Sequence, residues 1–60
     1  MQSDVEVEGK VVAETDRAIL VDIDGEEIWF PLSQVDVDYL SEDEVILTVP
    51  GWLARKLDLE

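Results

Sequence analysis

Carboxylates are the main reactive groups of this chain. Its 60 residues include 16 Asp and Glu, 4 Lys and Arg, no His and no Cys, so the formal net charge is −12. Without His or Cys, a nucleophilic hydroxyl lacks its usual base and zinc lacks its usual ligands. Paired carboxylates can act as acid and base in hydrolysis, but they need a cleft that a chain of this length can hardly build. We therefore expect no enzyme activity, no metal and no cofactor.

The segment Asp22-x-Asp24-Gly25-Glu26-Glu27 resembles part of a calcium loop. A full EF-hand loop also needs a third acidic position before the glycine, a glutamate at its twelfth position and flanking helices, none of which is present. Asp-Gly is instead the typical pair of a two-residue type I′ hairpin turn. We therefore interpret the segment as a hairpin between residues 18–23 and a strand from 26 to about 32.

Alternation of apolar and charged residues predicts the remaining strands. In 5–14 it places Val11 and Ala13 on the core face and Val12 on the opposite face, with a bulge or bend at Gly9. A short helix is expected after Pro50, docked so that Trp52 and Leu53 close one end of the sheet. The expected strands are 5–14, 18–23, 26 to about 32, 35–39 and 45–49, and the expected helix spans 50–57.

These elements predict an all-β fold, a small antiparallel SH3-like or OB-like partial barrel with a short C-terminal helix, as one domain over residues 1–60. A core this small is often stabilised by disulfides, a metal or association of subunits. Because the chain has no cysteine, we favour a homo-oligomer. No apolar run approaches the ~18 residues of a membrane span, and no signal peptide is recognisable, so we expect a cytoplasmic protein.

The two-residue hairpin fixes which side chains share a face. Leu20 then lies opposite Trp29 on the face away from the core, an aromatic–aliphatic pair where polar residues are usual. Contiguous apolar surface of this kind is typical of an interface, with acidic side chains as its rim. The predicted apolar interface residues are Val12, Leu20, Trp29 and Ile46, and the predicted acidic ones are Glu26, Glu27, Asp36 and Asp38.

The charge decides which partners are reasonable. It repels nucleic acid and anionic membranes and favours a basic protein surface. Acids on alternate strand positions lie about 7 Å apart, close to the phosphate spacing of one nucleic-acid strand, so mimicry of nucleic acid is a further hypothesis. Two alternatives stay open: a small nucleotide-like ligand stacked by Trp29, Tyr39 and Trp52 at a dimer interface, and a structural module from a salt-adapted organism.

Three segments carry a resemblance to a known group. They are Gly-Lys-Val-Val-x-x-Thr-x-x-Ala-Ile-Leu-Val at 9–21, Trp-Phe-Pro-Leu-Ser-Gln-Val at 29–35, and Val-Pro-Gly-Trp-Leu-Ala at 49–54. Together they resemble short uncharacterised small β-barrel proteins encoded by phages and other mobile elements. The resemblance implies a small barrel that acts by binding, in its most specific form as an inhibitor of a host protein. The high acidity of this chain departs from that group.

Overall fold

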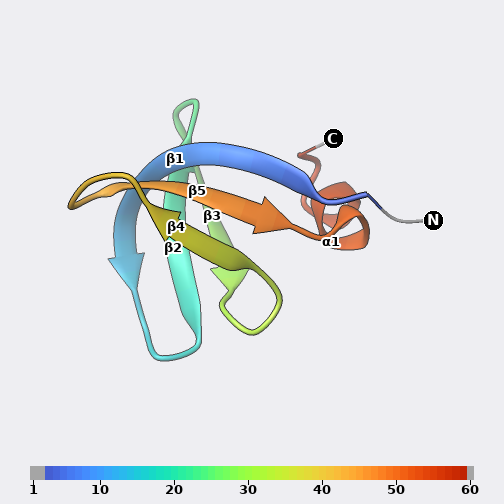
Figure 1. Ribbon diagram of the computed structural model, residues 1–60, viewed down its shortest axis with the longest axis horizontal. Helices are drawn as coiled ribbons and strands as arrows, with labels where there is room; N and C mark the ends of the chain where they lie inside the picture. The colour runs from blue at the N-terminus through green and yellow to red at the C-terminus, as the bar shows by residue number, and fades with distance from the viewer. Residues whose placement is uncertain (1–2, 60) are drawn as a thin grey trace.

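The computed structural model describes residues 3–59, which form one five-stranded antiparallel sheet and a short helix (Figure 1). Neighbouring strands follow the order β3-β2-β1-β5-β4, so β3 and β4 are the two edges and the sheet is not closed. The elements are β1 (Val5–Glu14), β2 (Ala18–Ile23), β3 (Glu26–Pro31), β4 (Asp36–Tyr39), β5 (Glu44–Val49) and α1 (Gly51–Lys56). The predicted antiparallel sheet with a C-terminal helix is confirmed.

The long strand β1 joins the two halves of the sheet. Up to Lys10 it pairs with β5, and from Lys10 onward it pairs with β2, while it arches over the other strands (Figure 1). Gly9 lies where the partner changes. A Cβ at Gly9 would lie 2.6 Å from the backbone oxygen of Asp22 and 2.6 Å from Cγ1 of Val21, so only glycine lets β2 pass this close.

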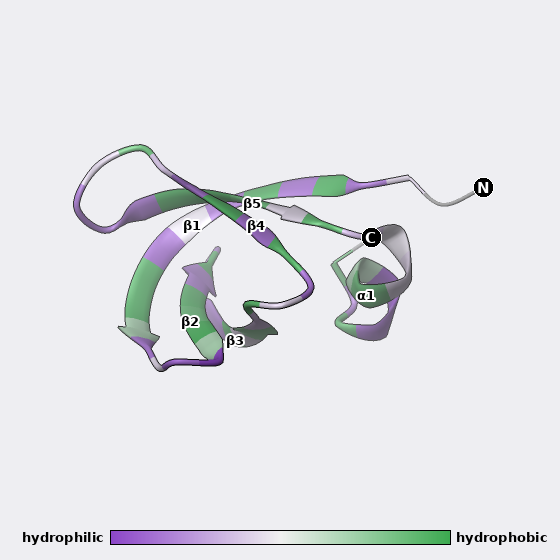
Figure 2. Ribbon diagram, turned by 60° about the horizontal axis from the view of Figure 1, so that its bottom comes forward, coloured by the Kyte–Doolittle hydropathy of each residue, from purple (hydrophilic) through white to green (hydrophobic). Residues whose placement is uncertain are grey.

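The core fills the space between the two halves of the bent sheet. Val21 and Phe30 come from one half, and Leu47 from the other, and all three are fully buried. The helix contributes Leu53 and Ala54 beyond the end of β5 (Figure 2). The buried residues are Ile19, Val21, Phe30, Val35, Val45, Leu47, Val49, Leu53 and Ala54.

The hairpin turn between β2 and β3 has the predicted geometry. Asp24 and Gly25 take φ values of 55° and 87°, and the Gly25 N–H donates to the Asp22 carboxylate at 2.8 Å. Ile23 pairs with Glu26, and each earlier residue of β2 pairs with the next one of β3. The register expected from a two-residue loop is therefore confirmed, including the pairing of Leu20 with Trp29.

The bulge of β1 lies at a different position from the one expected. The register with β2 shifts between Val11 and Ala13, so Val12 has no partner and Ala13 pairs with Leu20. An extra residue reverses the alternation beyond it, because successive side chains point to opposite faces. The prediction that Ala13 faces the core is consequently wrong: Ala13 is exposed and lies on the side of Leu20.

Candidate functional site

The strongest candidate is a row of apolar side chains on the outer face of the sheet, the face away from the core. Trp29, Leu20 and Ala13 are successive partners across β3, β2 and β1. The Trp29 side chain remains 48% exposed, and so does that of Val12 in the neighbouring bulge. We call Val12, Ala13, Leu20 and Trp29 the outer patch. It leaves in solvent an indole and a branched side chain that a monomer seldom leaves uncovered together.

A row of charged residues borders the outer patch. Glu27, Asp22, Lys10 and Glu44 are successive partners across β3, β2, β1 and β5. This row next to the apolar one thus holds three carboxylates and one ammonium group. The border remains negative, which favours a positively charged surface over a second acidic one.

The other predicted interface residues lie in two different places. Ile46 is on the outer face, but its partners are Glu8 and Asp38, and Ala13 lies five positions further along β1 than Glu8, about 16 Å of strand. Ile46 is therefore an apolar position between acids, apart from the outer patch. Glu26 pairs with Ile23 and belongs to the inner face, so it does not lie beside Glu27 on the outer one.

Two columns of acids flank β5 on the outer face. Glu6 and Asp36 both pair with Thr48, and Glu8 and Asp38 both pair with Ile46. Each column therefore runs along one strand, with about 7 Å between its members, and the columns are two strand spacings, about 9.6 Å, apart. These acids form a surface separate from the outer patch.

The inner side of the β2–β3 hairpin holds a hollow that the sequence did not reveal. It measures about 330 Å³ and lies between the hairpin and the segment after α1. Its apolar residues are only partly buried, and no Lys or Arg lines it. The residues lining it are Val7, Ile23, Ile28 and Leu59, with the acids Asp24, Glu26 and Asp58. Its position depends on a contact between distant segments, for which the sequence carries no local signal.

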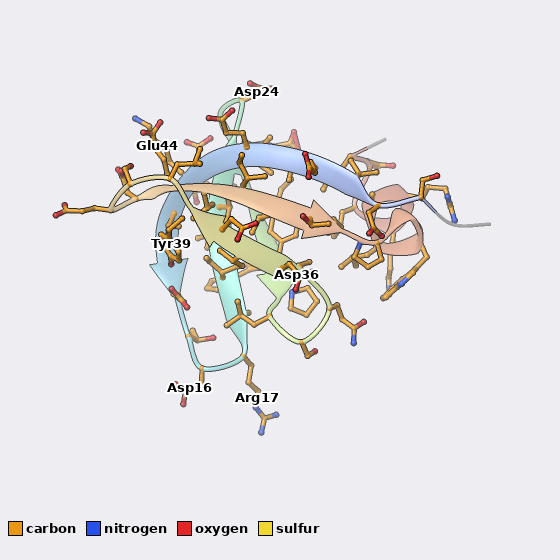
Figure 3. All side chains as sticks on the ribbon, in the orientation of Figure 1. Asp16, Arg17, Asp24, Asp36, Tyr39 and Glu44 are labelled. Carbon is orange, nitrogen blue, oxygen red and sulfur yellow. The ribbon has the colours of Figure 1, made fainter. Side chains whose placement is uncertain are left out.

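The turns at the two ends of β2 are polar. Asp24 lies at one end of the β2–β3 hairpin and Asp16 and Arg17 lie at the other end of β2, in the turn after β1 (Figure 3). Thr15 holds that turn, because its hydroxyl accepts from the N–H of Arg17 at 3.3 Å and from that of Ala18 at 3.1 Å. These turns bring no reactive groups together.

The three aromatic residues predicted to stack a ligand at a dimer interface lie apart within one chain. Tyr39 pairs with Val45 near the start of β5, whereas Trp52 follows the far end of that strand, and Trp29 is on the outer face of the opposite edge strand. Trp52 is 39% exposed. The expectation that it would close the sheet with Leu53 is wrong, because Leu53 and Ala54 are the side chains of this helix that belong to the core.

Tyr39 instead joins the two halves of the sheet. Its hydroxyl donates to Oε1 of Glu14 at 3.0 Å, which links β4 to the end of β1. This hydrogen bond, with some burial and the negative charge of Glu14, raises the pKa of Tyr39 above its ordinary value. The phenol therefore stays neutral at physiological pH and acts as a structural contact.

Acidic groups of residues 3–59 do not converge on a cation site. A depression of about 280 Å³ over the outer face is lined by Glu8, Gly9, Lys10, Asp22, Asp24 and Glu44. Within the part of the chain that the structure describes, no group of three or more Asp or Glu is placed to hold a metal ion.

Among residues 3–59, no helix has the length and apolarity to cross a membrane. Comparison of the chain with family models, curated proteins and solved structures finds no match.

Proposed function

We propose that this chain is a non-enzymatic binding module that docks its outer patch onto a basic surface of another protein. The observation that carries the proposal is the half-exposed indole of Trp29 opposite Leu20 on the outer face of the sheet. Tryptophan is a frequent anchor of protein interfaces, since it buries a large area at a small cost in side-chain entropy. An SH3-like partial barrel, open between β3 and β4, is the architecture that we propose for its scaffold.

The charge of the chain supports a basic partner. The net charge is −12, and the row next to the outer patch has three carboxylates for one lysine. Complementary charge accelerates encounter and excludes acidic competitors, while the apolar patch provides the lasting contact. The outer patch with this acidic border is thus suited to a partner that offers an apolar pocket surrounded by Lys and Arg.

The same residues could instead serve self-association through the outer patch. The salt dependence of association distinguishes a homo-oligomer from a complex with a basic protein. Two copies of a chain with charge −12 repel each other, so added salt strengthens a homo-oligomer. A complex with a basic protein responds in the opposite direction, because salt screens attraction. Sedimentation velocity at 50 mM and 500 mM NaCl therefore measures which association occurs.

Mimicry of nucleic acid is a second candidate, favoured by the two columns of acids that flank β5. A protein that binds phosphates would then contact Glu6, Glu8, Asp36 and Asp38. An inhibitor of a host nucleic-acid-binding protein, encoded by a phage, is the most specific form of this proposal. Its test is competition: a DNA duplex should displace the chain from its partner, and replacement of the four acids by amides should abolish inhibition.

The main proposal is tested by capture of proteins from an extract of the source cells at 50 mM NaCl. Immobilised wild-type chain should retain a partner with basic surface, and 500 mM NaCl should release it. Trp29→Ser should retain less than about a tenth of it, and Trp52→Ser, the matched change at the other exposed tryptophan, should retain it fully. Equal retention by both variants, or no retained partner, would contradict the proposal.

A further inference from the structure

The outer edge of β3 carries backbone groups that no other segment among residues 3–59 uses. In a two-residue hairpin the residues next to the turn form a hydrogen-bonded pair, here Ile23 and Glu26, and bonded pairs then alternate along the ladder. Ile28 and Phe30 therefore bond to β2, whereas Glu27 and Trp29 point their N–H and C=O away from it. The next bonded pair in this alternation is Arg17 and Leu32. The N–H of Leu32 indeed donates to the Arg17 oxygen at 2.9 Å.

This edge is uncovered within the part of the chain that the structure describes. The strand β3 pairs with β2 alone, and no loop or turn bonds the backbone of Glu27 or Trp29. Pro31, the next residue in this phase, has no N–H, and its oxygen accepts from Gln34 at 3.0 Å. The edge therefore offers four backbone groups on two residues and then ends at the proline.

We propose that the partner adds a short extended segment to this edge of β3 as a sixth strand, and that this segment is rich in lysine or arginine. The inference rests on the proposed function and adds the form of the partner. Addition of a strand to an open sheet edge is an established mode of peptide recognition, with affinity from backbone bonds and specificity from alternate side chains.

The side chains around the edge define the sequence of the segment. On the outer face, Glu27 and Trp29 attract cations, by charge and by the face of the indole respectively. On the inner face, the added strand would run beside Ile28 and the 330 Å³ hollow, which aliphatic side chains and three acids line. A segment of alternating cationic and aliphatic residues therefore satisfies both faces at once, because successive side chains of a strand point to opposite sides.

A second copy of the chain fits the same edge poorly. Pairing of β3 with its own copy would join two molecules of charge −12 edge to edge, each with Glu26 and Glu27 on the paired strand. The repulsion between two such chains opposes this pairing. The other edge, β4, is only four residues long and carries Asp36 and Asp38 on its outer face instead of an apolar ring. These features select β3 as the edge and a basic segment as its occupant.

The test uses the intact chain and a capped heptapeptide, Lys-Val-Lys-Ile-Lys-Val-Lys, with the same peptide carrying Glu in place of Lys as control. Amide hydrogen exchange followed by nuclear magnetic resonance reports each backbone N–H separately. We expect the lysine peptide to slow exchange at Glu27 and Trp29 by at least tenfold, and the glutamate peptide to have no effect. Ile28 and Phe30, already bonded to β2, should change little.

A pair of variants isolates the backbone contribution. Glu27→Gln removes the charge and keeps the N–H, whereas Glu27→Pro also removes the N–H without breaking a bond to β2, as Pro31 already does at the same edge. We expect Glu27→Gln to weaken peptide binding a few-fold and Glu27→Pro to weaken it at least tenfold more.

The inference is overturned if the peptide binds with unchanged exchange at Glu27 and Trp29, if both variants bind alike, or if the peptide does not bind. Its failure is distinguishable from that of the proposed function. A peptide that moves the Trp29 indole signal without protecting those two amides excludes strand addition and leaves the docking face in place. If the wild-type chain and Trp29→Ser capture the partner equally well, the outer patch is not the docking face, and the proposed function itself fails.

Discussion

Trp29 and Phe30 are neighbours on β3 with opposite environments, so they provide a direct comparison between a surface anchor and a core residue. Phe30 is fully buried, whereas Trp29 is 48% exposed. About half of the ~150–250 Å² of an aromatic side chain is therefore covered at Trp29, which at ~25 cal/mol per Å² stabilises the fold by at most about 2–3 kcal/mol. For Trp29→Thr we expect a loss of about 1–2 kcal/mol, because threonine keeps a methyl group and suits a strand.

Phe30→Ala should be far more damaging. Removal of a buried phenylalanine costs about 3–5 kcal/mol, close to the entire stability that a core of this size provides. Urea denaturation followed by circular dichroism should therefore show a cooperative transition for Trp29→Thr and a largely unfolded chain for Phe30→Ala. If the two variants lose the same free energy of unfolding, Trp29 is a core residue, and the outer patch is needed for folding and is not a surface available for binding.

Three further predictions concern the fold. Gly9→Ala should destabilise by about 1–3 kcal/mol, measured by urea denaturation, because the new Cβ meets a backbone oxygen at 2.6 Å; an unchanged midpoint would contradict the close approach of β2. Glu14→Gln should lower the pKa of Tyr39, the only tyrosine, in an absorbance titration of phenolate. Because this pKa is raised on folding, its stabilising contribution is complete below the unfolded value near ~10 and lost as pH rises through the folded value. The melting temperature should rise between 50 mM and 1 M NaCl as self-repulsion is screened, and a flat response would show that the charge of −12 does not oppose folding.

Local chemistry made the hairpin predictable. Asp24-Gly25 selects a two-residue turn, and this turn determines every pair of β2 with β3 as well as the outward position of Trp29. The bulge at Val12 was not predictable, because Val11, Val12 and Ala13 all tolerate a strand and no glycine or polar residue signals the extra position. The consequence is that Ala13, and not Val12, continues the apolar row.

Features that join distant segments were also missed. The side chain of Trp52 was expected to close one end of the sheet with Leu53, yet it is 39% exposed, and the core residues of α1 are Leu53 and Ala54. The hollow formed with Asp58 and Leu59 depends on the path of the chain after this helix. The hydrophobic periodicity and composition of a segment describe one strand or helix at a time. Contacts between distant elements follow only from the three-dimensional arrangement.

The two indole N–H signals of the chain provide the most direct test of the docking surface. Trp29 and Trp52 are the only tryptophans, so the loss of one signal in each serine variant assigns both. When the captured basic partner is added to the labelled chain, the signal of Trp29 should shift or broaden while that of Trp52 stays in place. A shift at Trp52 alone, or no change at Trp29 with the partner bound, would contradict the assignment of the outer patch as the binding face.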